Sequence, residues 1–414
     1  MRSTSTARSV VRRLAIARLI SVTGGAAAFA ALNYTIYERT GSAAWLSASL
    51  LLTFGVSGLF APLGGVLGDR FDRRRVMIAS DLAGAACFAA MALVDEPVLL
   101  IAVGFIAAVV ETPFWSASAA AIPNLVDEED LSWANGLVQL GSNAGIMLGP
   151  ALGGALLALI GAGAVFAANA LSFVLSAVLV ATARGRFAQD RSETQTEEHR
   201  GLRAGFVFIA RDRVLRTLVF AWCALVLGIG IAMVADVPLA EVFGAGSAGY
   251  GLMIGAWGAG SVIGSLAGRR LRKESEPRAL VLGSAIIGLT TAGIALSPRF
   301  WPVLVLLLLS GAADAVIMVA DRSIQQRRTP DAVRSRVVSA SEAMVTLSLT
   351  AGFALGGPLL ELVGPRAAYA IGGVGGLVGA IVLLPVLRAS RAQARDELVV
   401  VSQDEVLEPL RAAG

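Results

Sequence analysis

Twelve separate stretches of the chain are long and apolar enough to cross a lipid bilayer as helices, a crossing that takes about 20 residues. Short connections join nearly all of them. The stretches are Leu14–Tyr34, Leu46–Leu67, Val76–Val94, Val98–Ile122, Leu137–Ile160, Val165–Ala183, Leu215–Ala235, Gly249–Leu266, Leu280–Leu296, Pro302–Val319, Val338–Leu360 and Ala367–Leu387. The first follows several arginines, as a secretion signal would, but the stretches after it favour a retained helix. The sequence therefore predicts an all-α integral membrane protein with twelve transmembrane helices.

The composition excludes several other kinds of protein. Hydrophobic residues make up 56% of the 414 residues and charged residues only 15%, against roughly a quarter charged in ordinary globular proteins. A soluble fold could not bury this many apolar side chains, which excludes soluble enzymes, disordered chains, coiled coils and disulfide scaffolds. The two cysteines, Cys87 and Cys223, lie in apolar stretches, and the single histidine, His199, lies in a polar connection. No metal site and no cofactor are therefore expected.

Arginines mark one set of the connections. They cluster before the first stretch and in most connections after every second stretch, whereas the alternate connections hold only Arg39, Arg299 and Arg366. By the positive-inside rule, both termini are expected in the cytoplasm. Topology explains these charges, so no nucleic-acid partner is expected. Apart from a single lysine, Lys273, all the basic residues are arginines, which is typical of a GC-rich bacterial genome, and we expect the chain in a bacterial inner membrane.

The longest connection divides the chain into halves of six stretches each. It runs from about Arg184 to Arg213, and its second part has the pattern of an amphipathic helix at the membrane surface. Landmarks recur at spacings of 199 to 208 positions: Gly65 with Gly264, Pro123 with Pro330, and Gly149 with Gly357. We therefore expect two pseudo-symmetric six-helix bundles at residues 1–183 and 214–387, a cytoplasmic linker at 184–213 and a cytoplasmic tail at 388–414.

Two motifs in the first half resemble those of the major facilitator superfamily, and the resemblance covers the whole twelve-helix region. The loop after the second stretch reads Gly65-x-Leu67-x-Asp69-Arg70-x-x-Arg73-Arg74, with Asp72 where the superfamily usually has glycine. The fifth stretch reads Gly136-x8-Gly145-x3-Gly149-Pro150-x2-Gly153-Gly154 and resembles the exporter motif. The resemblance implies the major facilitator fold and outward antiport, as in bacterial drug, macrolide and siderophore exporters. The superfamily's arginine motif in the fourth helix is missing, so no proton-coupling residue is assigned from it.

The loop motif has a physical role that needs no family name. Asp69 can accept hydrogen bonds from Arg73 or Arg74, while Gly65 lets helices approach closely. Ion pairs with the facing half would then hold the cytoplasmic side closed. The alternative is that these arginines only set the topology.

The fifth stretch carries two different faces. Gly145, Gly149 and Gly153 recur every four residues, so they share a face on which small residues permit close helix packing. Pro150 bends or softens the helix. The opposite face carries Gln139, Asn143 and Met147, which we expect to face a central cavity. Packing alone is the alternative role of the glycines.

A few ionisable side chains interrupt the apolar stretches, where a charge is costly and invites a functional role. Glu111 lies midway along the fourth stretch, and Trp115 and Ser118 follow on its face. A desolvated carboxyl group can carry a proton near neutral pH. The candidates for proton coupling are Glu111, Asp314 and Arg18, with a structural ion pair as the alternative role. The candidates for the substrate cavity are Asn33, Trp115, Ser118, Gln139, Asn143, Met147, Asn169 and Met318.

These features favour a secondary active exporter of the multidrug type, moving small amphipathic or hydrophobic molecules outward by proton antiport and alternating access. A lysophospholipid flippase and a siderophore exporter on the same fold are alternatives. A transport-inactive receptor is less favoured, because it would not need polar groups such as Glu111 within the membrane. The chain has no phosphate loop for ATP and no catalytic cluster, so no enzyme is expected. We expect a monomer whose partners are a small-molecule substrate, protons and membrane lipid.

Overall fold

A computed structural model of the chain describes residues 4–56, 60, 71–127, 130–183, 187, 202–268 and 270–412. Within these residues the regular structure is helical throughout, and no strand occurs. Large apolar side chains such as Leu171 and Leu289 are exposed on the surface of the helices, as expected where lipid is the solvent. The prediction of an all-α integral membrane protein is confirmed.

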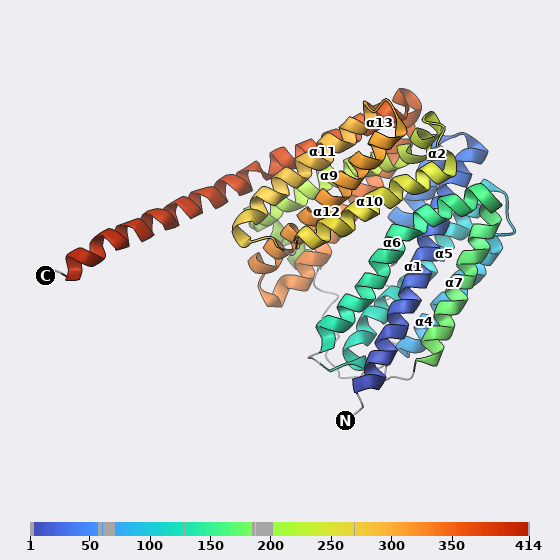
Figure 1. Cartoon of the computed structure of the whole chain (residues 1–414), viewed down its shortest axis with the longest axis horizontal. Coiled ribbons are helices and arrows are strands. Elements are labelled where there is room, and N and C mark those ends of the chain that lie inside the picture. The colour runs from blue at the N-terminus through green and yellow to red at the C-terminus, as the bar shows by residue number, and fades with distance from the viewer. Residues whose placement is uncertain are drawn as a thin grey trace.

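The first half of the chain forms one group of helices, here called the N-terminal group (Figure 1). It comprises α1 (Thr4–Thr40), α2 (Ala43–Leu50) with the π-helical segment η1 (Leu51–Val56), α4 (Arg73–Met91), α5 (Pro97–Leu125), α6 (Leu131–Ile160) and α7 (Ala162–Thr182). α1 packs against α6 and α7, and α4 packs against α5 and α7. Most of the rest of the second predicted span, residues 57–59 and 61–67, lies outside the described residues.

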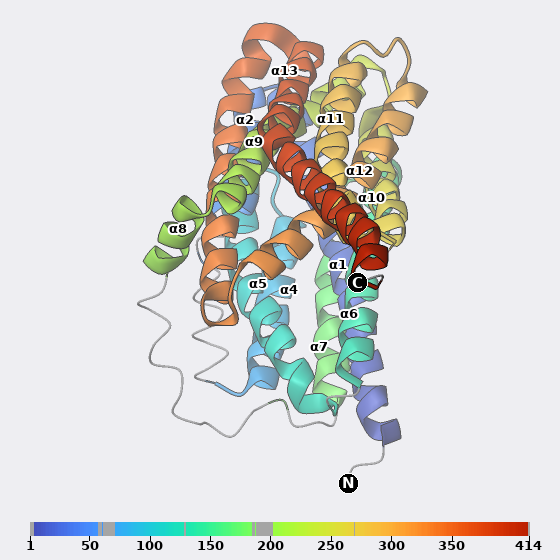
Figure 2. The same ribbon diagram turned by 90° about the vertical axis from the view of Figure 1, so that its left-hand side faces the viewer.

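The second half forms the C-terminal group (Figures 1 and 2). It comprises α9 (Arg213–Val242), α10 (Gly246–Gly268), η5 (Lys273–Ser275), α11 (Glu276–Ala295), α12 (Phe300–Arg328) and α13 (Asp331–Ala412). α13 packs along α9 and α11, and α12 packs between α10 and α11. The short helix α8 (Leu202–Arg211) falls in the predicted linker and packs on α13. The final turns of α13 project away from both groups (Figures 1 and 2).

All twelve predicted spans overlap helices, although only nine helical segments of the described chain satisfy the length and hydropathy expected of a membrane crossing. One of the nine, Arg336–Arg388, holds two predicted spans, because its backbone turns at Gly364. α2 with η1 is the described part of another span. α4 begins with three arginines and carries Asp81, which lowers its hydropathy.

Two glycines end equivalent helices in the two groups. Gly161 separates α6 from α7 with φ of 83°, and Gly364 interrupts α13 with φ of 78°. Side chains rarely adopt this left-handed conformation, so glycine is favoured at both turns. The two positions are 203 residues apart (364 minus 161), which lies within the spacing of the sequence landmarks. The repeat is therefore visible in the backbone as well as in the sequence.

Aspartates cap the first helix after each of two connections. Asp72 accepts a hydrogen bond from the backbone N of Arg75 at 3.0 Å and starts α4. Asp212 accepts from the backbone N of Val214 and Leu215 at 2.8 and 3.0 Å and starts α9. Such caps satisfy amide groups that the helix leaves free. Asp72, the departure from the superfamily's usual glycine, thus has a structural role.

Candidate functional site

The two groups of helices meet at one end of the molecule, called here the closed end, which carries the turns at residues 41–42, 161 and 243–245. There α6 packs on α10, and α2 packs on α13. Gly154 and Gly251 bring the backbones of α6 and α10 so close that a Cβ on either would collide with the other helix. Small residues of this kind allow close helix contact.

Four hydrogen bonds cross between the groups at the closed end. Tyr34 donates its hydroxyl to Glu241 Oε1 at 2.5 Å, and Ser247 donates to the carbonyl of Gly154 at 3.2 Å. Ser42 donates to Glu361 Oε1 at 3.4 Å, and Ser47 donates to the carbonyl of Phe353. Each bond joins a residue of one group to a residue of the other, so the closed end is held by polar as well as apolar contacts.

Away from the closed end the two groups diverge towards the end that carries the N-terminus (Figure 1). The side of α6 opposite its glycines exposes Gln139 and Asn143, and Gln139 donates to Asn143 Oδ1 at 2.8 Å. Trp115 on α5 is 44% exposed, and Met318 on α12 is 43% exposed. Polar, aromatic and thioether groups are therefore exposed on α5, α6 and α12.

One buried cation lies beside this region. Arg18 on α1 is only 8% exposed. Its guanidinium carbon lies 3.4 Å from the ring centroid of Trp115 and 5.4 Å from that of Phe114. This geometry is a cation–π contact, which is strongest when the cation is desolvated. Arg18 Nε has no hydrogen-bond partner among the described residues, so the stacked ring covers a part of the guanidinium that no hydrogen bond satisfies.

Two carboxylates accompany Arg18. Asp81 on α4 is 1% exposed and interacts electrostatically with Arg18, while Glu111 on α5 is half-buried and interacts with Asp81. The formal charges of these three groups are one positive and two negative. A low-dielectric site disfavours a net charge, so uptake of one proton would neutralise the set. We call Arg18, Asp81 and Glu111 the charge cluster.

The candidates in the C-terminal group lie apart from the charge cluster. Asp314 on α12 is buried, as are the nearby Ser310 and Asp321, whereas Met318 is exposed. Asp321 accepts a hydrogen bond from Gln325 at 2.7 Å. These carboxylates are enclosed within their own group of helices.

Three other candidates are packed inside the N-terminal group. Asn33 donates to the carbonyl of Phe29 at 2.9 Å and accepts from Ser49 at 3.0 Å. Asn169 accepts from Ser172 at 2.9 Å, and Ser118 is buried. The buried positions of these side chains contrast with the exposed faces of Gln139 and Asn143. Met147 is half-buried and packs against Gly258 of α10.

The glycine face of α6 lies against α1. A Cβ at Gly145 would lie 2.9 Å from the backbone N of Thr23, and one at Gly149 would lie 2.6 Å from its carbonyl oxygen. A Cβ at Gly153 would meet the backbone of Ala27 at 2.5 Å. Gly136, by contrast, has no such neighbour within 4 Å. The motif brings α6 against α1 and turns Gln139 and Asn143 the other way.

The described part of the loop motif binds within its own group. Arg73 donates to the carbonyl of Ala120 at 2.7 Å, and Arg74 donates to the carbonyl of Val180 at 3.2 Å and to that of Ala181. These carbonyls lie near the ends of α5 and α7, where basic groups are favourable. Gly65, Asp69 and Arg70 lie outside the described residues.

Sequence reasoning did not identify a polar pair that joins α9 to α13. Asp236 on α9 accepts a hydrogen bond from the hydroxyl of Tyr369, which is buried on α13 next to Tyr250. The seventh stretch was ended at Ala235, but α9 continues to Val242. The apolar residues that follow Asp236 were the available signal that the helix continued past it.

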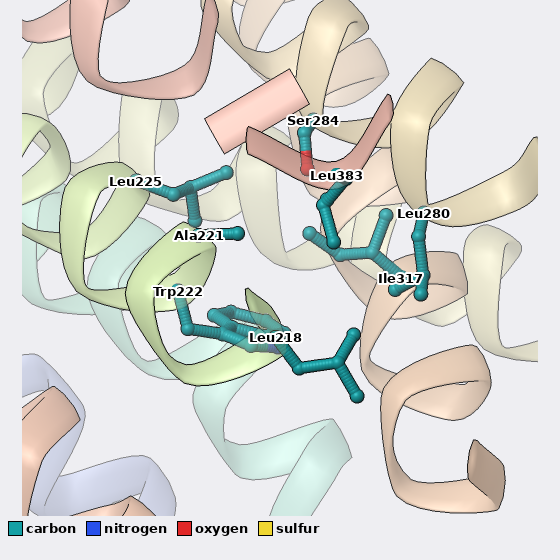
Figure 3. A pocket seen from close by; sticks show the side chains of 8 residues that line it. All are labelled: Leu218, Ala221, Trp222, Leu225, Leu280, Ser284, Ile317 and Leu383. Atoms are coloured by element: carbon teal, nitrogen blue, oxygen red, sulfur yellow. The ribbon is translucent and has the colours of Figure 1, made fainter. Parts of the chain in front are cut away.

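The enclosed pocket within the C-terminal group is too small for a cargo. It has a volume of about 10 Å³, room for one water molecule, and lies between α9, α11, α12 and α13 (Figure 3). Leu218, Trp222, Leu280 and Ile317 line it with Ser284 (Figure 3). Its lining is nearly all apolar, so it is a gap in helix packing.

Comparisons with known proteins agree with this architecture. Residues 6–412 match a family described as transmembrane secretion effectors. The uncharacterized MFS-type transporter YfiS of Bacillus subtilis is 27% identical over 85% of this chain and 87% of its own length. The enterobactin exporter EntS of Shigella boydii is 28% identical over 91% of each chain. The crystal structure of a bacterial homologue of the iron transporter ferroportin, in an inward-facing state, has a TM-score of 0.74 at 17% identity, covering 91% of this chain and 98% of that one.

Proposed function

Because this chain belongs to the transmembrane secretion effector family of the major facilitator superfamily, we propose that it exports small amphipathic or hydrophobic molecules in exchange for protons. Both termini lie in the cytoplasm of the proposed bacterial inner-membrane topology, so the closed end faces outward. The conformation described above is then open to the cytoplasm. The chain works as a monomer. Its two bundles, at residues 1–183 and 214–387, rock about a central site. Residues 184–213 link the bundles, and the tail follows at 388–414.

The charge cluster is the observation that carries the proposal. Arg18 balances only one of the carboxylates Asp81 and Glu111, so the set is neutral when one of them holds a proton. Buried titratable groups of this kind are typical of proton pathways in transporters. Glu111 is only half-buried and lies one turn from the exposed Trp115, which supports access of a proton or cargo to its carboxylate. Binding of one then disfavours binding of the other.

Alternating access requires the closed end to open in each cycle. Four hydrogen bonds and the glycine contacts of α6 and α10 join the groups there. An intramolecular hydrogen bond contributes only about 1 kcal/mol net. Contacts of this number and strength can hold the closed end shut and can still break reversibly in each transport cycle.

The accessible residues indicate the kind of cargo. Trp115 and Met318 offer an aromatic ring and a flexible thioether, which adapt to varied apolar shapes. The amides of Gln139 and Asn143 provide hydrogen bonds to a polar part of the same molecule. The relative EntS is named as an exporter of enterobactin, and this compound is one candidate cargo. A siderophore and a lysophospholipid remain the alternatives to a drug-like compound, and a transport-inactive receptor is less favoured because it needs no charge cluster.

Purified protein in proteoliposomes with a pH-sensitive dye inside tests this proposal. Ethidium, enterobactin and a fluorescent lysophospholipid, added one at a time, identify the cargo that drives proton movement. Glu111→Gln removes the ionisable group while keeping its shape, so it is expected to abolish cargo-driven proton movement and leave cargo exchange in place. Glu96→Gln is the matched control, because Glu96 is exposed at the N-terminal cap of the same helix.

Full cargo-driven proton movement in Glu111→Gln would contradict the role of this residue. Cargo transport that ignores both the pH gradient and an uncoupler would contradict proton antiport for the whole protein. If all three compounds bind but none crosses the membrane, the receptor interpretation replaces the exporter.

A further inference from the structure

A second pocket lies at the closed end, far from the charge cluster. Its volume is about 370 Å³, which is within the range of small-molecule sites. α1 contributes Thr35 and Glu38, the last turn of α6 contributes Leu157 and Ala158, and α10 contributes Ser247. The pocket is therefore assembled from both groups of helices.

The walls of this pocket are tied together by the contacts that close this end. Ser247, one lining residue, donates to the carbonyl of Gly154 across the groups. Tyr34, another lining residue, donates to Glu241 of the C-terminal group. Movement of the groups apart at this end breaks both bonds and separates the walls. The complete pocket thus belongs to the closed state alone.

The charge around the pocket is negative. Glu38 is exposed there, with no hydrogen bond or ion pair among the described residues. Arg39 also lines the pocket, but Asp95 holds its guanidinium at 2.6 Å and offsets its charge. Glu241 adds a second carboxylate next to Tyr34. An entering cation would meet an uncompensated Glu38.

Thr35 adds a polar residue to the wall of the pocket. It is 2% exposed, and its hydroxyl has no hydrogen-bond partner among the described residues. A buried hydroxyl without a partner is costly. The serines and threonines nearby behave differently: Thr40, for example, donates to the carbonyl of Ile36 at 2.7 Å. The Thr35 oxygen is covered by neighbouring atoms, so a ligand in the pocket reaches it once the side chain rotates.

We propose that this pocket binds a small organic ammonium ion and thereby holds the closed end shut. The ammonium group lies near the carboxylate of Glu38 and the hydroxyl of Thr35, and the apolar part of the ion rests on Leu157 and Ala158. A ligand that binds only one state shifts the protein towards that state. The site shares no residue with the charge cluster, and its effect on closure rests on the proposed alternation between the open and closed states.

Titration of the full-length purified protein in detergent with benzylamine, which is protonated at neutral pH, tests the pocket. We expect saturable binding, weakened about fivefold in Glu38→Gln, as for a partly exposed charge pair. Benzyl alcohol, the uncharged analogue, is expected to bind more weakly, and Ala158→Trp, which fills the pocket, to abolish binding. Glu96→Gln removes a similar charge outside the pocket and is the control. Unchanged binding in either Glu38→Gln or Ala158→Trp, or equal binding of the alcohol, would overturn the proposal.

A variant outside the pocket tests the link to closure. Gly357→Val strains the contact of α13 with α2, because its Cβ would lie 2.8 Å from that of Ser47, and Gly357 does not line the pocket. Spin labels at Leu93 and Leu296, exposed on the two groups, report how far this variant opens. Benzylamine is expected to bind several-fold more weakly to the opened variant and to bring the labels together again. Closure by the ligand would be refuted if the opened variant bound benzylamine as tightly as the native protein and benzylamine left the distance between its labels unchanged.

The same ammonium chemistry is present in free amines and in lipid headgroups. Nanodiscs of phosphatidylethanolamine and of phosphatidylglycerol, without benzylamine, distinguish the two sources. Closer labels in phosphatidylethanolamine, lost in Glu38→Gln, assign the site to a lipid headgroup. Equal label distances in the two lipids, with benzylamine still closing the protein, assign it to a free ammonium ion.

Discussion

The two groups of helices share an architecture but differ in the polar groups they enclose. The N-terminal group buries Arg18 with Asp81, beside the half-buried Glu111. Within the spans of the C-terminal group, Asp236 and Asp321 accept hydrogen bonds from the uncharged Tyr369 and Gln325. The partly buried ion pair of this group, Glu276 with Arg327, lies at the start of α11. A carboxylate balanced by a cation responds strongly to a change of charge, whereas one held by neutral donors responds mainly to a change of shape. This difference supports the proposal that charge coupling resides in the first group.

The glycines of the repeated helices serve two kinds of contact. Gly149 brings α6 against α1, within the N-terminal group, whereas Gly357 brings α13 against α2 of the other group. One glycine therefore supports the fold of its own group and the other supports the closed end. At the 203-residue spacing of Gly161 and Gly364, Gly357 is equivalent to Gly154, which also contacts the other group.

The largest expected effect comes from removing the buried cation. Arg18→Met leaves Asp81 and Glu111 without their positive partner and should lower the free energy of unfolding by about 3 kcal/mol at neutral pH. The loss should shrink as the pH falls, because protonation neutralises the carboxylates. Denaturant titration in detergent at several pH values measures this.

Arg18→Lys is the matched control for this change. It keeps the charge but loses the planar stack on Trp115, so it should recover more than half of the lost stability. Equal losses in the two variants would mean that stacking, not charge balance, is the role of Arg18.

The glycine comparison predicts different outcomes for the same substitution. Gly149→Val places a Cβ 2.6 Å from the carbonyl of Thr23 and should destabilise the fold by about 2 kcal/mol, as overpacking does. Gly357→Val should lower the free energy of unfolding less than Gly149→Val does. It should instead increase the distance between spin labels across the closed end. Gly136→Val, which meets no atom within 4 Å, is the control for both. Comparable unfolding in all three variants would remove the distinction between the two glycines.

The neutral hydrogen bonds of the C-terminal group should contribute less than the buried charge. Tyr369→Phe deletes the donor to Asp236 and should cost about 1.5 kcal/mol, because a buried acceptor loses its partner. Tyr250→Phe removes a nearby hydroxyl. Among the described residues Asp236 accepts its hydrogen bond from Tyr369 and not from Tyr250, so this change should lower the free energy of unfolding less. Thermal unfolding of the two variants in detergent compares them, and a larger loss in Tyr250→Phe would show that the wrong tyrosine was assigned.

The sequence was sufficient for the helices but only partly for the site. Apolar length placed all twelve spans, because the cost of exposing backbone to lipid acts on every helix alike. It also singled out Glu111 and Trp115, since each is unusual where it stands. Residues such as Asn33 and Asn169 are equally polar, yet they are enclosed by neighbouring helices. Helical rotation decides between these outcomes, and it depends on contacts between distant segments.

Asp81 and Asp236 illustrate the same limit. Asp81 is not among the candidates that the sequence singles out, and Asp236 lies one residue beyond the seventh predicted stretch. Their importance comes from Arg18 and Tyr369, which are 63 and 133 positions away (81 minus 18, and 369 minus 236). A single sequence carries no direct record of which distant side chains meet, whereas the local spacing of the α6 glycines was enough to predict a packed face.

The smallest expected effects come from the exposed ion pairs that each group carries near a helix start. Arg8 lies 3.1 Å from Asp130 in the N-terminal group, and Arg328 lies 3.3 Å from Asp212 in the C-terminal group. Arg8→Gln and Arg328→Gln should each change the free energy of unfolding by about 0.5 kcal/mol or less, because solvent and salt screen such pairs. The aspartates should differ, since Asp212 also caps α9, whereas Asp130 makes no such side-chain bond to α6. Asp212→Ala should therefore cost about 1 kcal/mol more than Asp130→Ala in the same denaturant titration, and equal costs would mean that the cap adds nothing beyond the ion pair.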